Sequence, residues 1–313
     1  MVSTPKIGVS SCLLGEKVRY DGDHKHDRYL TDVLGPLVSF VPVCPEVGAG
    51  LPVPREPMRL EGDRSAPRLV TTRTRIDLTD RMSAFCREKV VELEREDLCG
   101  FIFKKGSPSS GLHRVKVYNR GAAARSGRGL FAQAVTEHFP LLPVEEEGRL
   151  SDPALRENFL ERVFAYRRWK DFCRDDGGLG GLIRFHACHK LQLMAHNPQL
   201  YREIGRLVAG GKSLGREELL CRYEGLFMRA LSYRATARKH VDVLMHMMGY
   251  FKQQLSADEK VELLELFDRY RHGVVPLAAP LSLIKQYVRT FDQGYLKQQT
   301  YLDPYPVEAL PGQ

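Results

Sequence analysis

The sequence predicts two domains of different class, an α/β domain with a parallel sheet in residues 1–150 and an all-α domain in residues 151–313. Three observations predict this division. Short apolar runs alternate with amphipathic helical stretches in the first half, which is typical of a parallel sheet. Strand signals are nearly absent from the second half. The length of 313 residues also exceeds the ~250–300 residues at which a single core usually stops growing.

Each strong strand signal of the first half ends in a loop of small residues. Residues 6–10 (KIGVS) lead into a Cys–Gly loop, residues 37–43 end at a Cys–Pro pair, and residues 100–104 (GFIFK) end in a Gly/Ser/Pro loop. A weaker strand signal covers residues 76–78. Helical spacing covers residues 82–94 and 130–138, and residues 141–144 are expected to form a strand after the second of these helices.

The second half begins at a strong helix start. Asp152 is an N-cap residue and Pro153 occupies the first helical position of a helix over 153–172. Ser256, followed by acidic residues in the first turn, marks another start. Further helices are predicted at 182–195, 199–209, 216–231, 236–254, 257–273 and 280–291, and the Pro-rich tail 302–313 is predicted to be extended.

Composition narrows the class of protein. The formal net charge of +8 favours polyanionic partners, although it says nothing about the fold. The apolar runs are all much shorter than the stretch of about 20 residues that is needed to span a bilayer. The N-terminus also has no signal-peptide pattern, so we expect a cytoplasmic protein without membrane contact. The seven dispersed cysteines form no CxxC pair, which argues against a zinc ribbon or a thioredoxin-type site.

The loops after the three strong strands carry the reactive side chains. One loop brings Cys12, the next brings Cys44 with Glu46 two residues later, and residues 106–111 bring three serines in a Ser-Pro-Ser-Ser-Gly turn. Because ligands of open α/β sheets bind outside the carboxyl ends of the strands, we expect these loops to form one site. Converging thiols can hold a metal or act as nucleophiles, and the carboxylate suits general acid–base work.

Residues 1–150 resemble the TudS-type thiouracil desulfidases, a Rossmann-like family. The resemblance rests on SSCLLG at 10–15, VRYDG at 18–22, PVCPEVGAGLPVPREP at 42–57 and GSPSSGL at 106–112. Residues 151–310 resemble the helical domain of the longer RudS-type proteins, through FHACHKLQLMAHNP at 185–198, ATARKHVDVLMHMMGYFKQQLSADEK at 235–260 and YLDPYP at 301–306.

The resemblance implies an iron–sulfur enzyme. Three cysteines of the family hold a 4Fe–4S cluster with one iron lacking a protein ligand, and that iron takes the sulfur of a thiocarbonyl while water replaces it. Cys12 and Cys44 match two cluster ligands, Glu46 matches the catalytic carboxylate, and Ser107 matches a catalytic serine. The expected substrate is thiolated uracil, as 4-thiouridine in tRNA or as free thiouracil, and the products are uracil and sulfide.

The third cluster ligand is missing. The family loop reads Ser-Pro-Ser-Cys-Gly, and this chain carries Ser110 where the cysteine is expected. A serine hydroxyl is hard and rarely deprotonated near neutral pH, so we expect impaired cluster binding. Either a Cys→Ser change was introduced, or this is a natural variant with lost or altered activity; the intact remaining motifs favour the first.

Other residues are candidates for substrate contact. Tyr20 could stack on a base and Asp21 could hydrogen-bond its edge, while a purely structural turn is the alternative. Ser10, beside the Cys12 loop, and Ser109, in the serine loop, are further candidates.

The helical domain carries candidate RNA contacts at Arg234, Arg238 and Lys239, with a solvated basic face as the alternative. His186, His189 and His196 share one helix face, and we expect this stripe to face the other domain or an RNA phosphate rather than to bind a metal. Cys86 and Cys221 are expected to be buried apolar residues.

Two other functions compete with the desulfidase. One is a non-catalytic RNA-binding protein with at most a structural cluster, and the other is a sulfur carrier that uses Cys12 or Cys44. The additional basic helical domain favours tRNA over a free base, because a desulfidase acting on a free base does not need it.

Overall fold

The computed structural model describes residues 3–119 and 122–310. Contacts divide the chain into two compact units, one formed by Met1–Arg167 with Pro306–Gln313 and the other by Arg168–Tyr305. The boundary falls inside helix α4 (Pro153–Asp175), beyond the predicted boundary at residue 150. The C-terminal segment returns to unit 1, where the Tyr29 hydroxyl donates a hydrogen bond to the Ala309 carbonyl at 3.0 Å.

Unit 1 contains the predicted parallel sheet, with strand order β2-β1-β5-β8. Its strands are β1 (Lys6–Ser10), β2 (Ser39–Val43), β5 (Leu98–Phe103) and β8 (Val144–Glu146). β2 begins later than predicted because Gly35–Leu37 forms a 3-10 turn that contains Pro36. The strand expected at 141–144 is displaced, since β8 only begins at Val144.

A second sheet, which the sequence does not predict, has the order β4-β3-β6-β7. Its strands are β3 (Met58–Gly62), β4 (Pro67–Thr71), β6 (Val115–Asn119) and β7 (Ala122–Gly127). β3 pairs antiparallel to β4 and parallel to β6. Charged residues interrupt the apolar pattern of β3 and β6, so these two strands could not be recognised in the sequence. The strand expected at 76–78 is wrong, because only Asp77 makes an isolated bridge to Val70.

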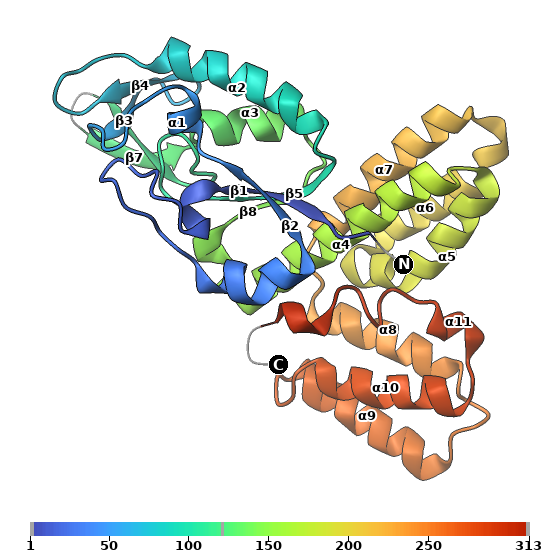
Figure 1. The fold of residues 1–313 in the computed structure, drawn as a ribbon. Coiled ribbons are helices and arrows are strands. Elements are labelled where there is room, and N and C mark those ends of the chain that lie inside the picture. Colours follow the sequence, from blue (N-terminus) through green and yellow to red (C-terminus); the bar gives the residue numbers. More distant parts are fainter. Residues whose placement is uncertain (1–2, 120–121, 311–313) are drawn as a thin grey trace. The chain divides into compact units, whose positions relative to one another are not determined.

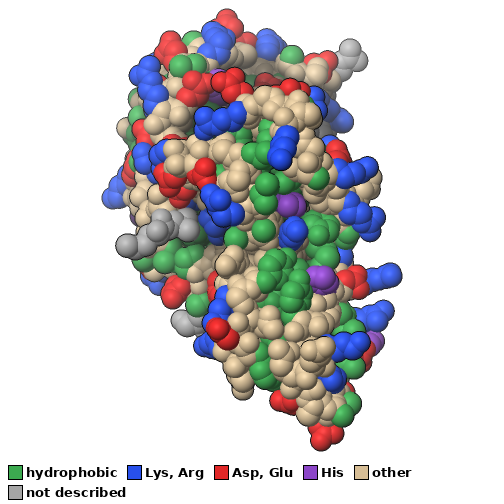
Figure 2. Space-filling view, turned by 90° about the vertical axis from the view of Figure 1, so that its right-hand side faces the viewer, with side chains coloured by type: hydrophobic (Ala, Val, Ile, Leu, Met, Phe, Trp, Pro, Cys, Tyr) green, Lys and Arg blue, Asp and Glu red, His purple; other side chains and the backbone are tan. Residues whose placement is uncertain are grey.

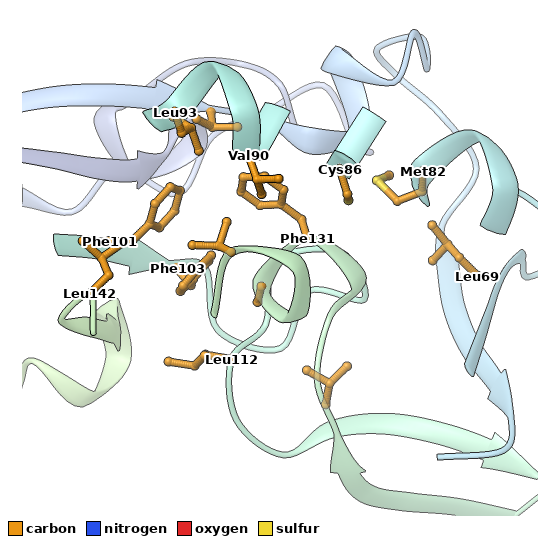
Figure 3. Close-up of a cluster of buried hydrophobic side chains, with 14 of the residues drawn as sticks. Leu69, Met82, Cys86, Val90, Leu93, Phe101, Phe103, Leu112, Phe131 and Leu142 are labelled. Carbon is orange, nitrogen blue, oxygen red and sulfur yellow. The ribbon is translucent and has the colours of Figure 1, made fainter. Parts of the chain in front are cut away.

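Helices α2 (Thr79–Glu94) and α3 (Leu130–His138) lie side by side over the strands (Figure 1) and supply the core of unit 1. Figure 3 shows Phe131 of α3 beside Phe101 and Phe103 of β5. The rings of Phe101 and Phe103 stack at 4.3 Å, and Phe131 meets Phe101 edge-on at 5.8 Å. This aromatic packing fixes β5, and with it the loop that follows β5.

Helices are the only regular elements among the described residues of unit 2, as predicted. Its helices after α4 are α5 (Leu179–His196), α6 (Pro198–Ala209), α7 (Arg216–Ser232), α8 (Ala237–Gly249), α9 (Ala257–Arg271), α10 (Ala278–Thr290) and α11 (Gly294–Lys297). α9 starts in a capping box between Ser256 and Glu259, which confirms the predicted start.

Two further expectations concern the chain ends and the bilayer. The tail is not simply extended, because Val307–Ala309 forms a 3-10 turn. In the part of the chain that the structure describes, every helix is too short or too polar to cross a membrane.

Candidate functional site

The three predicted loops meet at one edge of the parallel sheet. Cys12 lies in a 3-10 turn (Ser11–Leu14) after β1, and Cys44 precedes the short helix α1 (Pro45–Gly48) after β2. Because β1 lies between β2 and β5, the carboxyl ends of all three strands are neighbours. Their loops line a pocket of about 430 Å³, the thiol pocket, which includes Cys12, Cys44, Glu46, Ser107 and Ser110. The expected convergence of these five residues is confirmed.

The serine loop is held by the N-terminus of α3. The carbonyl of Pro108 accepts from the backbone N–H of Leu130 at 3.3 Å, and that of Ser109 accepts from Phe131 at 2.9 Å. The first N–H groups of a helix have no partner within it, so this loop satisfies them. A Cβ on Gly129 would lie 2.4 Å from the Ser109 oxygen, so only glycine permits this close approach.

Glu46 is held by two serines and an arginine. Its Oε1 accepts from Ser109 Oγ at 2.7 Å and from Ser107 Oγ at 3.5 Å, and the two hydroxyl oxygens lie 2.9 Å apart. Its Oε2 pairs with Arg55, which also donates to the Val18 carbonyl at 2.9 Å. The carboxylate therefore has a fixed position, with one oxygen directed to the hydroxyl groups.

Arg55 is the residue that sequence reasoning missed. Its side chain is only 5% exposed, and it lines the thiol pocket. It lies within the PVPREP segment, but no local spacing signals a pairing with Glu46, nine residues away. The tertiary fold alone brings the two charges together.

Replacement of Arg55 by leucine is expected to lower the free energy of unfolding by up to about 3–5 kcal/mol, because it leaves the largely buried carboxylate of Glu46 without its partner. The double variant Arg55→Leu/Glu46→Leu should recover much of this loss. Urea denaturation of the wild type, both single variants and the double variant measures the coupling. Additive losses would contradict the ion pair.

Cys12 is buried and Cys44 is half-buried, which affects the protonation of both thiols. Burial raises the pKa of Cys12 to about 11, although the positive charge of Lys104 opposes the shift. Burial also raises the pKa of Cys44, against the backbone N–H groups of Val47 and Glu46. Both thiols are therefore neutral near pH 7, and a metal ion must displace their protons to bind.

The donor set does not fit a three-thiolate cluster. Two thiols are present, and the third position holds the hydroxyl of Ser110, which is 3% exposed. Over residues 3–119 and 122–310, no three His, Cys, Asp or Glu side chains gather so that they could hold a metal ion. The serine at position 110 accounts for the missing third donor.

Two of the three candidate substrate residues outside the serine loop line the thiol pocket, and one does not. Tyr20 lines the thiol pocket and is 43% exposed, so its ring is accessible. Ser10 also lines the pocket, and its hydroxyl accepts from the backbone N–H of Lys104 at 2.9 Å. Asp21 is not part of the lining and pairs with Arg19 at 3.1 Å.

The remaining cysteines lie outside the thiol pocket. Cys86 is buried in α2, as expected, but the expectation for Cys221 is wrong because it is exposed on α7. Cys99 is fully buried in β5, and its thiol donates to the Asp97 carbonyl at 3.8 Å. It therefore cannot replace Ser110 in the pocket.

The histidine stripe of α5 is buried, so its expected role at an RNA phosphate is wrong. His186 lies 3.3 Å from the hydroxyl of Tyr223, and its pKa falls to about 4 because of burial. His189 Nδ1 lies 2.8 Å from the Phe185 carbonyl, and burial holds its pKa well below the usual value. His196 is only 2% exposed. The three rings support the packing of unit 2.

The three candidate RNA contacts differ in their exposure to solvent. Arg234 and Arg238 are exposed, whereas Lys239 is half-buried and donates to the His196 carbonyl at 2.7 Å. Lys239 therefore stabilises the end of α5. On the face seen in Figure 2, Lys and Arg side chains alternate with acidic and hydrophobic ones and form no single patch.

Comparison with known proteins shows the family. The family model for 2-thiouracil desulfurase matches residues 7–147, and that for a protein of unknown function (DUF1722) matches residues 190–306. The uncharacterized protein YbgA of Escherichia coli (strain K12) is 32% identical over 151 residues, which cover 48% of this chain and 89% of that protein. A solved structure of the 4Fe–4S-dependent thiouracil desulfidase TudS is 31% identical, with a TM-score of 0.41, and covers 49% of this chain and 98% of that one. The chain belongs to the fused family in which a TudS-like 2-thiouracil desulfurase domain is followed by a DUF1722 domain.

Proposed function

We propose that this protein is an iron–sulfur-dependent desulfidase that converts thiolated uracil in tRNA to uracil and releases sulfide. The observation that carries the proposal is the convergence of Cys12, Cys44, Glu46 and Ser107 in the thiol pocket, within the part of the chain that matches the 2-thiouracil desulfurase family. In the Ser110 form we expect impaired activity. With a cysteine at position 110, three thiols would line one pocket, and we propose that this form holds the 4Fe–4S cluster named for TudS.

The side chains around Glu46 suit the proton transfers of this reaction. Removal of sulfur replaces the C=S bond by C=O, so that water supplies the oxygen and both of its protons leave with sulfide. Glu46 can accept a proton from water, and the Ser107 and Ser109 hydroxyls, linked to Glu46 Oε1, can pass it onward. Arg55 keeps the carboxylate oriented.

The test compares substrates and forms of the pocket. Anaerobically reconstituted protein with Ser110→Cys is assayed for uracil and sulfide with free thiouracil, thiouridine and thiolated tRNA. Catalytic sulfide release supports the desulfidase. Uptake of sulfur by Cys12 or Cys44 from an added small-molecule persulfide, which leaves as its thiol, without sulfide release from the thiolated substrates would support the sulfur carrier. Binding of tRNA without turnover would support an RNA-binding protein.

We further propose that unit 2 contributes to tRNA binding through Arg234 and Arg238, which are exposed. The variant Arg234→Gln/Arg238→Gln is expected to reduce the slope of log K against log salt concentration by about two, because each lost phosphate contact removes about 0.9 from it. Filter binding over a range of salt concentrations measures this slope. Arg184→Gln/Arg222→Gln is the matched control, since both arginines are exposed but paired with acids. Equal losses in both variants would contradict a specific role.

A further inference from the structure

Helices α5 and α6 of unit 2 enclose a pocket of about 580 Å³, here called the α5–α6 groove. This volume lies within the roughly 300–1,000 Å³ that is typical of small-molecule sites. Asn197 joins the two helices, and the first turn of α5 and the last turn of α6 line the same space, so the helices run antiparallel along it. None of the described residues that line the thiol pocket lines this groove.

One end of the groove is apolar. Leu179, Ile183 and Ala187 follow one another at every fourth position of α5, so they share one face of that helix. Val208 and Ala209 of α6 line the same space. The Ile183 side chain is 50% exposed, although a large aliphatic side chain is usually buried. This end therefore offers apolar surface to a ligand.

The groove also carries positive charge without a matching negative charge. Lys190, Arg202, Arg206 and Lys212 line it, and no carboxylate is found among its described lining residues. Over residues 3–119 and 122–310, no acidic side chain forms an ion pair with any of these four cations. Lys190 and Arg202 border the end near Asn197, opposite the apolar end.

A buried hydrogen-bond donor lies between the two ends. His186 is 4% exposed and lines the groove, and its Nδ1 lies 3.3 Å from the Tyr223 hydroxyl. That hydroxyl is fully buried and has no other hydrogen-bond partner in the described chain, so it donates to Nδ1. The ring proton is therefore on Nε2, and the ring is neutral near pH 7 because burial lowers the pKa of His186 to about 4. Within the described chain, the Nε2–H group has no acceptor.

Gly205 keeps this donor accessible from the groove. A Cβ at this position would have one neighbour within 4 Å outside its own stretch of helix, namely His186 Nε2 at 4.0 Å, so packing does not require a glycine. A glycine inside a helix is less stable than an alanine. A larger side chain at position 205 would cover Nε2, and glycine leaves it open.

We propose that the α5–α6 groove binds a small organic carboxylate with an apolar body. One carboxylate oxygen accepts from His186 Nε2–H, and Lys190 and Arg202 balance its charge. The apolar body lies along Leu179, Ile183 and Val208, which a hydrated phosphate backbone would leave unused. Neither the proposed desulfidation nor its substrate involves this groove, so the inference stands independently of both.

The experiment is a calorimetric titration of the full-length protein with octanoate. Octanamide has nearly the same body without the charge, and acetate has the charge without the body. One charge-assisted contact corresponds to about tenfold in affinity, so octanoate is expected to bind at least about tenfold more tightly than octanamide. Burial of the additional methylene groups should make octanoate bind at least about a hundredfold more tightly than acetate.

Two variants locate the ligand. Gly205→Leu fills the groove and should abolish octanoate binding, while the melting temperature rises or stays unchanged because leucine favours a helix. Lys190→Met/Arg202→Met should bring the ratio of octanoate to octanamide affinity near one. Arg184→Met/Arg222→Met is the matched control with the wild-type ratio, since these two arginines pair with acids outside the groove.

Several outcomes would overturn the inference. Equal affinities for octanoate and octanamide would remove the carboxylate, and unchanged binding in folded Gly205→Leu would place the ligand elsewhere. Orthophosphate or an unmodified RNA that binds more tightly than octanoate, and loses affinity in Lys190→Met/Arg202→Met, would assign the groove to phosphate instead. Sulfide release is not measured in any of these titrations, so failure of the proposed function leaves their result unchanged.

Discussion

Replacement of Ser110 by cysteine is expected to raise bound iron from a small fraction to about four atoms per chain after anaerobic reconstitution. The side chain at position 110 is buried in the thiol pocket with Cys12 and Cys44, so a thiol there completes a set of three soft donors. The change replaces one oxygen by sulfur, which the loop held by α3 can accommodate. Iron and sulfide analyses with the visible absorption spectrum measure the outcome.

Two controls give this prediction its specificity. Ser110→Ala should bind no more iron than the present chain, because it adds no donor. Cys86→Ser in the Ser110→Cys background should keep the cluster, since Cys86 is buried in α2 away from the pocket, whereas Cys12→Ser in that background should lose it. A full complement of iron in the unmodified Ser110 chain would contradict the prediction.

Glu46→Gln in the Ser110→Cys background should keep the cluster and lower turnover by roughly 10²–10⁴-fold, which is the usual contribution of a general acid–base group. Glutamine has the size of glutamate and can still accept the hydrogen bond from Ser109, so the loop should remain folded. It cannot titrate, so it cannot take a proton from water or return one to sulfide. Rates of uracil formation measure the loss.

The visible spectrum of the cluster shows whether a lower rate comes from loss of iron or from loss of proton transfer. Thermal unfolding shows whether the variant is less stable because Arg55 then faces a neutral glutamine. Near-normal turnover with an intact spectrum would remove Glu46 from the mechanism. Ser107, which lies 2.9 Å from Ser109 in the same hydrogen-bonded group, would then be the next residue to replace.

The meeting of the three loops could be predicted because it follows from strand order alone. Apolar runs that end in Cys12, in Cys44 and in the serine turn place these residues at one edge of a parallel sheet, and the structure places them there. The specific Rossmann-like topology, the roles of the residues and the tRNA substrate stay predictions. They depend on a resemblance and on chemistry that strand order does not determine.

The features that could not be predicted all depend on contacts between residues that are far apart in the sequence. The second sheet was missed because its strands are only five or six residues long and charged residues interrupt the apolar positions of β3, β4 and β6, so no run is long enough to be recognised. Arg55 lies in the loop before β3, and only the tertiary fold pairs it with Glu46. The stripe of His186, His189 and His196 was recognised as one face, but helical spacing does not tell whether that face packs inside.

The return of the C-terminal segment to unit 1 has a consequence for how the protein can be dissected. In chain topology the helical unit is an insertion with two attachment points rather than an appendage with one. Val163 of α4 packs directly against Gly100 of β5, since a Cβ on Gly100 would lie only 2.8 Å from the Val163 side chain. A chain cut at residue 150 would lose Val163 and expose this part of β5. Exchange of the helical unit between relatives is therefore expected to succeed as an internal replacement that keeps residues 153–167 and 306–310 with the desulfurase part.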